Sequence, residues 1–153
     1  MTQDITILVA TMSGTAEMVA DEIASRIEDA GGGARIVRME KAGVATLSGA
    51  DGPILICSST YGTGDVPDNG QALYAALERG RPDLSGLRYG VVALGDSVYP
   101  QTFCFGGRKF DDLFAALGAV RIGERFEHDS RSGIYPEDAA ADWAEQWFEQ
   151  LEA

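Results

Sequence analysis

The chain of 153 residues has few of the features that mark several common protein classes. Its two cysteines are too few for a disulfide framework and fit a reducing compartment. It has no run of about 18 apolar residues, so no membrane-spanning helix is predicted. The first residues, MTQDITILVA, lack the basic start and small-residue cleavage site of a secretory signal. We therefore expect a cytoplasmic protein.

Basic residues are also scarce. Twelve lysines and arginines face 24 aspartates and glutamates, which gives a net charge of −12. This balance argues against binding to nucleic acid or to an anionic membrane, because both need a basic face. It fits steering toward a basic partner, and it fits simple solubility equally well. The length predicts one domain over residues 1–153, and we expect a monomer.

Short apolar segments alternate with amphipathic ones along the whole chain. The apolar segments predict strands over residues 5–10, 34–39, 53–57, 89–94 and 120–126. The amphipathic segments predict helices from Thr15 to the glycines at 31–33, from an N-cap at Asp68, from about 110 to Gly118, and from Pro136 through Leu151. This alternation predicts an α/β fold of three layers, a parallel sheet with helices on both faces.

Three polar, glycine-rich segments follow the first, third and fourth predicted strands: TMSGTAE, SSTYGTGDVPDN and LGDSVYPQTFC. In such sheets, ligands bind at the carboxyl ends of the strands. The three segments therefore predict one binding site where they meet.

The first of these segments leads directly into a helix. Unpaired N–H groups at a helix N-terminus attract an anion, and Gly14 allows close approach of the backbone. No lysine follows Gly14, so this is not the loop of a nucleoside triphosphatase, and no GxGxxG fingerprint is present. The loop favours a phosphate group, although it also fits a capped helix that binds nothing.

The other two segments each carry a tyrosine. Tyr61 and Tyr99 are placed to hold a flat ring between them, with Asp96 near its polar edge. A tyrosine of this kind, taken alone, is more often a partly buried surface aromatic, and the expected convergence of the two loops is what favours the slot. A phosphate site beside a two-sided aromatic slot describes flavin mononucleotide (FMN).

These three segments resemble the flavodoxin family in its short-chain form. The first resembles that family's phosphate loop, and the others resemble the flavin loops of the FMN domains of sulfite reductase, cytochrome P450 reductase and nitric oxide synthase. The tail IYPEDAAADWAEQW is similar to the small MioC-type flavodoxins. The resemblance spans essentially the whole chain and implies a five-stranded parallel sheet in the order 2-1-3-4-5.

The resemblance also implies a role for each matching residue. The phosphate would be held by Thr11, Met12, Ser13, Gly14, Thr15 and Ala16. One wall of the flavin slot would be Ser59, Thr60, Tyr61, Gly62 and Gly64, and the other Leu94, Gly95, Asp96, Tyr99, Phe103 and Cys104. The Gly62 carbonyl would accept a hydrogen bond from the N5–H group of the one-electron-reduced flavin. Three residues separate Tyr99 from Phe103 where relatives usually have two, which leaves the placement of Phe103 and Cys104 open.

The implied function is a non-covalent FMN electron carrier of low potential, working between a flavodoxin reductase and an acceptor enzyme with basic docking faces. Two alternatives stay open: an FMN-dependent quinone-type oxidoreductase and an accessory flavodoxin-like protein. A response-regulator receiver is disfavoured, because Cys57, Ser58 and Ser59 stand where it needs an aspartate. No segment suggests a substrate site, so a carrier is favoured over an enzyme. We expect no catalytic residue, no metal and a solvated His128.

Overall fold

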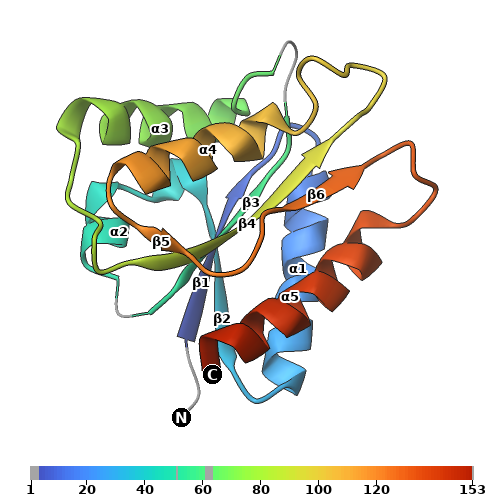
Figure 1. The fold of residues 1–153 in the computed structure, drawn as a ribbon, viewed down its shortest axis with the longest axis horizontal. Helices are drawn as coiled ribbons and strands as arrows, with labels where there is room; N and C mark the ends of the chain where they lie inside the picture. Colours follow the sequence, from blue (N-terminus) through green and yellow to red (C-terminus); the bar gives the residue numbers. More distant parts are fainter. Residues whose placement is uncertain (1–3, 51, 61–63, 153) are drawn as a thin grey trace.

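The computed structural model describes residues 4–50, 52–60 and 64–152, and Figure 1 shows a central sheet between two helical layers. The described strands are β1 (Asp4–Ala10), β2 (Gly33–Arg38), β3 (Ile54–Ser58), β4 (Arg88–Gly95), β5 (Val120–Arg121) and β6 (Phe126–Asp129). The helices are α1 (Thr15–Asp29), α2 (Val44–Ser48), α3 (Asp68–Gly80), α4 (Phe105–Ala116) and α5 (Pro136–Glu152), with a 3-10 turn, η1 (Met39–Lys41). All pairs of strands are parallel, in the predicted order β2-β1-β3-β4-β5, with β6 also paired to β4.

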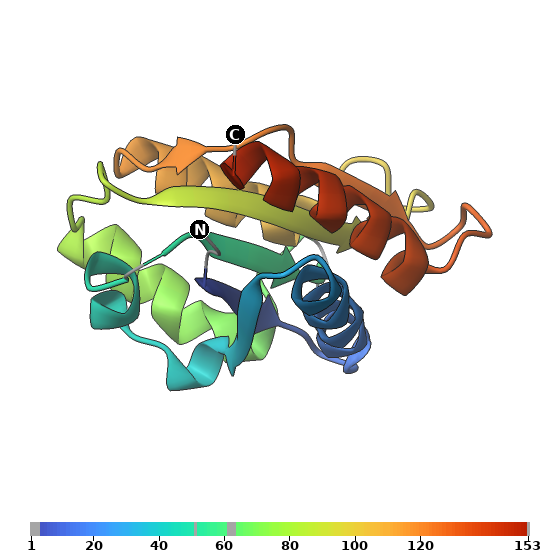
Figure 2. The same ribbon diagram turned by 90° about the horizontal axis from the view of Figure 1, so that it is seen from below.

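The sheet is buried on both faces, which explains why its central strands are continuous apolar runs. Alternate residues of β1 enter different cores. Ile5, Ile7 and Val9 pack with α1 and α5, whereas Leu8 and Ala10 pack with α3 and α4. Helices α1 and α5 lie against each other on one face of the sheet, as Figure 2 shows. Among the described residues, no helix combines the length and apolar character needed to cross a membrane.

The predicted fifth strand over residues 120–126 is wrong in its extent, because it is two short strands. β5 pairs with the start of β4 and β6 with its end. The Ile122 N–H still donates to the Tyr89 carbonyl over 2.8 Å, and the next residue, Gly123, has a left-handed backbone (φ 71°) that breaks the strand.

A buried carboxylate on α4 lies beside this break. Arg121 and Arg125 each donate a hydrogen bond of 2.6 Å to Asp111 Oδ2, and the Tyr89 hydroxyl donates to Asp111 Oδ1 over 2.6 Å. The two arginines that flank the break therefore share one carboxylate.

Three further details differ from the sequence-based expectation. The polar link after β2 contains η1 and α2. Asp68 is the first residue of α3 rather than its N-cap, a position that Pro67 occupies. His128 is buried in β6 rather than solvated, because its Nε2 lies 2.7 Å from the carbonyl oxygen of Ile134 and ties down the next loop. Cys57 is buried in β3.

Candidate cofactor-binding site

The loop after β1 presents a helix N-terminus to solvent. Gly14 adopts a left-handed conformation (φ 89°), which favours glycine, and its N–H donates to Thr11 Oγ1 over 3.0 Å. The hydroxyls of Ser13 and Thr15 lie 3.2 Å apart above the first turn of α1. No side-chain hydrogen bond caps this helix at Gly14. Its first N–H groups therefore remain suited to an anion.

The other predicted members of this loop differ in exposure. The Met12 side chain is 44% exposed, and its sulfur accepts a hydrogen bond from the Asp68 N–H over 3.3 Å. Ala16 is fully buried against the core. A ligand at the loop would therefore meet the Met12 side chain, but only the backbone of Ala16.

The loop after β3 connects the two neighbouring loops. The Ser59 N–H donates to the Ala10 carbonyl over 2.9 Å, next to the loop after β1. The Thr60 hydroxyl donates to the Leu94 carbonyl over 3.0 Å and accepts from the Gly106 N–H over 3.0 Å. The Thr60 side chain thus links this loop to the end of β4 and the start of α4. Only the backbone of Thr60 is then available to a ligand.

Two of the predicted residues of this loop, Tyr61 and Gly62, lie outside the described residues. Gly64 is described and has a left-handed backbone (φ 102°). A Cβ atom at this position would lie 3.0 Å from Phe105 and 3.2 Å from Thr102. The loop after β3 therefore packs closely against the loop after β4, and glycine suits that contact.

The loop after β4 places an aromatic ring in solvent. Tyr99 is 62% exposed, and successive turn hydrogen bonds, including Tyr99 N–H to the Asp96 carbonyl over 3.1 Å, compact the loop. These turns accommodate the extra residue before Phe103. The Phe103 ring packs partly against the core below the loop. Tyr99 is thus the described aromatic of this loop that is free to contact a flat ligand.

The remaining predicted residues of this loop, Leu94, Gly95 and Cys104, lie deeper. Leu94 is 7% exposed and the Cys104 side chain is fully buried. The Cys104 thiol donates to the Ala93 carbonyl over 3.4 Å, and burial raises its pKa to about 12. A Cβ atom on Gly95 would lie 2.6 Å from the Cys104 nitrogen, so the two backbones touch. Cys104 therefore contributes an unreactive side chain and its backbone.

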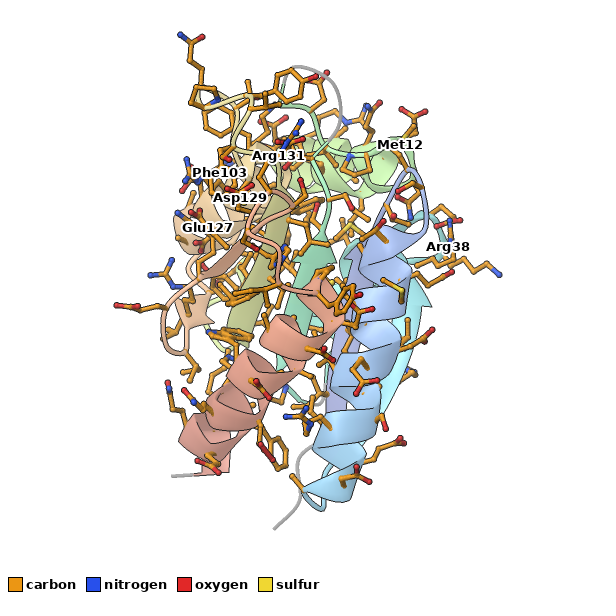
Figure 3. The ribbon with its side chains drawn as sticks, turned by 90° about the vertical axis from the view of Figure 1, so that its right-hand side faces the viewer. Met12, Arg38, Phe103, Glu127, Asp129 and Arg131 are labelled. Carbon is orange, nitrogen blue, oxygen red and sulfur yellow. The ribbon has the colours of Figure 1, made fainter. Side chains whose placement is uncertain are left out.

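The structure brings the described parts of the three loops to one edge of the sheet. They follow β1, β3 and β4, which are adjacent strands, so their carboxyl ends lie together (Figure 1). Figure 3 shows Met12 at one side of this edge and Phe103 at the other. The predicted meeting of the three segments at one edge of the sheet is therefore observed for their described parts, and the roles of the individual residues stay predictions.

The sequence pattern missed the residues that support the first loop. Asn69 Oδ1 accepts a hydrogen bond from the Thr11 N–H over 2.8 Å, and its Nδ2 lies 3.0 Å from both the Val9 carbonyl and Glu40 Oε1. Arg38 donates to Glu40 over 3.0 Å. The hydrogen bonds from Asn69 and then Arg38 lower the pKa of Glu40 to about 2. The only available signal was the aspartate–asparagine pair that closes the second motif.

Arg38 also supplies a cation beside the lysine-free loop. Its Nη1 donates to Glu17, in the first turn of α1, over 2.8 Å. The residue comes from the end of β2, and nothing in the sequence of the loop after β1 indicated it. The phosphate-type site is therefore less anionic than the count of acidic residues suggested.

The loop after β6 was also missing from the predicted site. Arg131 donates from Nε to Asp96 Oδ1 over 2.9 Å, and the Val98 N–H donates to the same oxygen over 2.9 Å. These two bonds, in that order, lower the pKa of the Asp96 carboxyl. Asp129 Oδ1 accepts from the Ser97 N–H over 3.0 Å. The loops after β4 and β6 thus form one unit.

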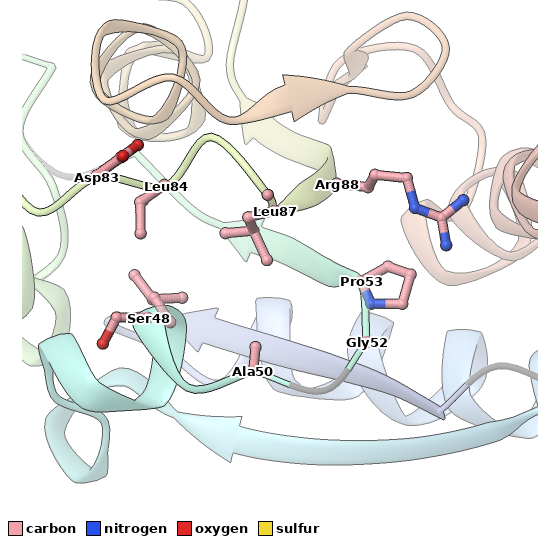
Figure 4. A pocket seen from close by; sticks show the side chains of 10 residues that line it. Ser48, Ala50, Gly52, Pro53, Asp83, Leu84, Leu87 and Arg88 are labelled. Carbon is pink, nitrogen blue, oxygen red and sulfur yellow. The ribbon is translucent and has the colours of Figure 1, made fainter.

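A separate hollow of about 290 Å³ lies at the opposite end of the sheet (Figure 4). Its walls are the segments that precede β3 and β4, with Leu47, Pro53 and Leu87 among the lining residues. The Asp83 carboxylate at its rim accepts a hydrogen bond from the Ser85 N–H over 3.0 Å. None of the three predicted motifs reaches this hollow, so it is not the predicted site.

The fold and the site define a doubly wound α/β protein with a phosphate-type loop and an exposed aromatic at the carboxyl edge of its sheet. Residues 7–147 match the family model described as flavodoxin. Flavodoxin YqcA of Pectobacterium carotovorum is 37% identical over 148 residues, covering 96% of each chain. Protein MioC of Escherichia coli K12 is 34% identical over 155 residues, covering 97% of this chain and 98% of its own. A cysteine-to-alanine mutant of flavodoxin from Pseudomonas aeruginosa superimposes with a TM-score of 0.87 at 32% identity, covering 98% of this chain and 99% of its own.

The chain therefore belongs to the flavodoxin family, whose members bind FMN and carry electrons. This confirms the family resemblance that the three motifs indicated. The predicted three-layer α/β fold is confirmed as well. The described residues fit this cofactor. An uncapped helix N-terminus with hydroxyl donors suits its phosphate, and the exposed Tyr99 ring suits its flavin.

Proposed function

We propose that this chain holds FMN non-covalently where its three loops meet and shuttles single electrons at low potential between a reductase and an acceptor enzyme. The observation that carries the proposal is the coupling of the loops. Ser59 bonds to the end of β1, Thr60 to the end of β4, and Asp96 to Arg131 beyond β6. Bound FMN supplies the redox chemistry, and the protein sets its affinity, orientation and potential.

In this proposal, the phosphate lies over the N-terminus of α1. The N–H groups at the start of this helix donate to it, and the hydroxyls of Thr11, Ser13 and Thr15 add further donors. The Thr11 hydroxyl already accepts from the Gly14 N–H over 3.0 Å, so the loop has its shape before the ligand arrives. Arg38 is paired with both Glu17 and Glu40 and so offsets part of their negative charge. In this proposal, the N–H groups and hydroxyls would hold the dianion without a lysine.

The flavin ring in this proposal stacks on Tyr99, with Tyr61 on its other face. The backbones of Ser59, Thr60, Gly62 and Gly64 line one side, and those of Leu94, Gly95, Asp96 and Cys104 line the other. Met12 and Phe103 contribute apolar contacts at the ends. The Asp96 carboxylate is bonded to Arg131 and so holds its loop in place. In this proposal, Asp96 therefore contacts the flavin through its backbone N–H and not through its carboxylate.

The charge of the protein favours a low potential. Each carboxylate about 10 Å from an anionic reduced flavin raises its energy by about 0.4 kcal/mol at the dielectric of water, before screening by salt. Pairing of Glu17 and Glu40 with Arg38 reduces the contribution of the nearest carboxylates. The stacked tyrosines act in the same direction, because a desolvated slot disfavours added charge.

FMN titration tests the proposal. Added apoprotein should quench the fluorescence of FMN at one equivalent, and Tyr99→Ala should weaken binding. Val120→Ala, which changes an exposed apolar residue of β5 beside the start of β4, should leave binding unchanged. Potentiometry should place the second-electron couple below that of free FMN. Unchanged FMN fluorescence would overturn the assignment of the cofactor site, and a couple at or above that of free FMN would overturn the low-potential role.

A second measurement separates a carrier from an enzyme. Mixed with NADPH and a quinone, the FMN-loaded protein should show no turnover until a reductase is added. Turnover by the protein alone would favour the quinone-type oxidoreductase instead.

A further inference from the structure

The first turn of α4 holds the loop after β3 at both of its described sides. The Gly106 N–H donates to Thr60 Oγ1 over 3.0 Å, on one side of residues 61–63. On the other side, a Cβ atom at Gly64 would lie 3.0 Å from Cδ2 of Phe105, so the Phe105 ring packs against the Gly64 backbone. The position of this helix turn therefore fixes both described sides of the loop.

Gly106 brings the turn and the loop into direct backbone contact. A Cβ atom at this position would overlap the Ser59 carbonyl oxygen, so a residue larger than glycine would push the two segments apart. Close-packed contacts transmit displacements because they leave no free space to absorb them. A shift of the turn would therefore move the loop as well.

An ion pair between α4 and β6 holds the turn from its other side. Arg108 Nε and Nη2 donate to Glu127 Oε2 and Oε1 over 2.6 and 2.8 Å. The two side chains are 34% and 23% exposed, so the pair is partly shielded from water. Two parallel hydrogen bonds between a guanidinium and a carboxylate fix the orientation of the side chains as well as their distance. The bond from Arg108 is also the main cause of the lowered pKa of Glu127.

The same guanidinium contacts the aromatic rings at the start of α4. Arg108 Cζ lies 5.7 Å from the centre of the Phe105 ring and 5.8 Å from the centre of the Phe103 ring. At this distance, a guanidinium over a ring is attracted to the ring's face. The contact joins the ion pair to Phe105, the residue that packs against Gly64.

Glu127 is in turn anchored to the core. Arg125 donates from Nε to Glu127 Oε2 over 2.9 Å and from Nη1 to Asp111 Oδ2 over 2.6 Å. The Asp111 side chain is buried in α4. The carboxylate that holds Arg108 is therefore itself held on both sides, and it does not follow the exposed loop.

We infer that Arg108 and Glu127 are positioning residues for the cofactor, which hold the loop after β3 against the flavin through Phe105 and Gly106. They act through the geometry of their ion pair rather than through their charges. The inference rests on the proposed function and names residues outside the three motifs that set the redox behaviour of the same site.

The held loop bears on how the flavin accepts its two electrons. It includes Gly62, whose carbonyl is the predicted acceptor for the N5–H group of the one-electron-reduced flavin. A hydrogen bond made in that state raises the first one-electron potential and lowers the second. A loop held in place should therefore widen the gap between the two potentials, and a loosened loop should narrow it.

Two substitutions of opposite charge separate positioning from electrostatics. Arg108→Gln removes a positive charge and Glu127→Gln a negative one, but both disrupt the same pair. Charge alone acts on the anionic, fully reduced flavin, so it would widen the gap in Arg108→Gln and narrow it in Glu127→Gln. Positioning predicts a narrower gap in both, and a dissociation constant for oxidised FMN that rises about threefold or more in both, within the range for residues of one network.

Potentiometric titration of the FMN-loaded variants measures the gap, and fluorescence titration measures the dissociation constant. Arg79→Gln and Glu124→Gln are the matched controls, because they remove the same charges from exposed positions elsewhere. Both controls should keep the wild-type values. A wider gap in Arg108→Gln, or equal changes in the variants and their controls, would overturn the inference.

Arg108→Lys tests the geometry of the pair at constant charge. Lysine cannot donate two parallel hydrogen bonds to the carboxylate or place a planar group over the rings. The variant should therefore resemble Arg108→Gln in both measurements. Wild-type values in Arg108→Lys would show that a positive charge suffices and would contradict a positioning role.

A double-mutant cycle tests the route through Phe105. Arg108→Gln should raise the FMN dissociation constant less in the Phe105→Leu background than in the wild type, because the ring that joins the pair to the loop is already absent. An equal rise in the two backgrounds would refute this route and the inference with it.

Measurements on the wild type separate this inference from the proposed function. If the wild type does not bind FMN, both fail. If it binds FMN with a second-electron potential below that of free FMN, but Arg108→Gln and Glu127→Gln match their controls, only the positioning role fails.

Discussion

Arg131 donates a hydrogen bond from Nε to Asp96 Oδ1 over 2.9 Å and joins the loop after β6 to the loop that carries Tyr99. The two residues are 59% and 32% exposed, so the ion pair is solvated and contributes little to global stability. Its effect is local, because Asp96 Oδ1 also accepts the Val98 N–H and thereby fixes the turn before Tyr99.

Arg131→Gln should therefore weaken FMN binding without unfolding the protein. We expect a higher FMN dissociation constant and a change of less than about 1 kcal/mol in the free energy of unfolding. Fluorescence titration and urea denaturation measure the two quantities. Arg26→Gln, which removes a comparable surface pair with Asp142, is the control and should leave FMN affinity unchanged. Equal affinity in the wild type and Arg131→Gln would show that the pair does not position the flavin loop.

Asn69→Ala tests the support of the phosphate-type loop. The side chain accepts from the Thr11 N–H and donates to the Val9 carbonyl, so its removal leaves partly buried backbone groups unpaired. We expect a loss of about 1–3 kcal/mol in the free energy of unfolding of the apoprotein, together with weaker FMN binding. Glu78→Ala, at an exposed position of the same helix, is the control, and a similar loss there would contradict the role given to Asn69.

Glu40 predicts a pH dependence of stability. Its pKa in the folded protein is about 2, against 4.5 as the ordinary value, because Asn69 and Arg38 bond to the carboxylate. The stabilisation is therefore fully present above pH 4.5 and is lost as the pH falls toward 2. The difference in unfolding free energy between the wild type and Glu40→Gln should shrink over this interval in urea titrations. A difference that is constant with pH would refute the lowered pKa.

The layered fold could be predicted from the sequence, because parallel strands buried on both faces consist of continuous apolar residues. Residues 5–10, 53–57 and 89–94 matched β1, β3 and β4 within one or two positions, and the glycine-rich segments marked their carboxyl ends. Because helices cover both faces of the sheet, the strands do not alternate between apolar and polar residues. This regularity made the strand order and the convergence of the loops predictable.

The break between β5 and β6 was not predictable by the same reasoning. The segment VRIGERF alternates like an edge strand, and nothing in it reveals that Arg121 and Arg125 share a carboxylate on α4. His128 was misplaced for a related reason, because its polar neighbours suggested a loop while its ring closes a buried contact. A local sequence pattern indicates which residues are buried and whether they repeat like a strand or a helix. The ion pairs of Arg121 and Arg125 and the burial of His128 depend instead on contacts between segments that are distant in the sequence.

The supporting residues of the site were missed because they lie on other elements. Arg38 ends β2, Asn69 lies in the first turn of α3, and Arg131 follows β6, yet each bonds to a residue of, or next to, a predicted loop. The count of 24 acidic residues was visible in the sequence, but their concentration on α1 and α5 appears only once these helices are seen to pack together.

Asp111 provides the sharpest test of the side-chain network beside the break in the last strand. Its carboxylate is 4% exposed and accepts hydrogen bonds from Arg121, Arg125 and the Tyr89 hydroxyl, each over 2.6 Å. Asp111→Ala leaves two guanidinium groups and a buried hydroxyl without their common partner. We expect a loss of about 3–5 kcal/mol in the free energy of unfolding, measured with urea.

The neighbouring residue supplies the control for this substitution. Asp112 is exposed on the same turn of α4, so Asp112→Ala removes the same group and charge without breaking the network. It should change the stability by less than about 0.5 kcal/mol. Arg121→Met on the Asp111→Ala background should recover part of the loss, because it removes the guanidinium that has lost its carboxylate, whereas Arg125 keeps its bond to Glu127 Oε2 over 2.9 Å. If Asp111→Ala and Asp112→Ala lowered the free energy of unfolding by similar amounts, the network around Asp111 would contribute no more to stability than an exposed carboxylate.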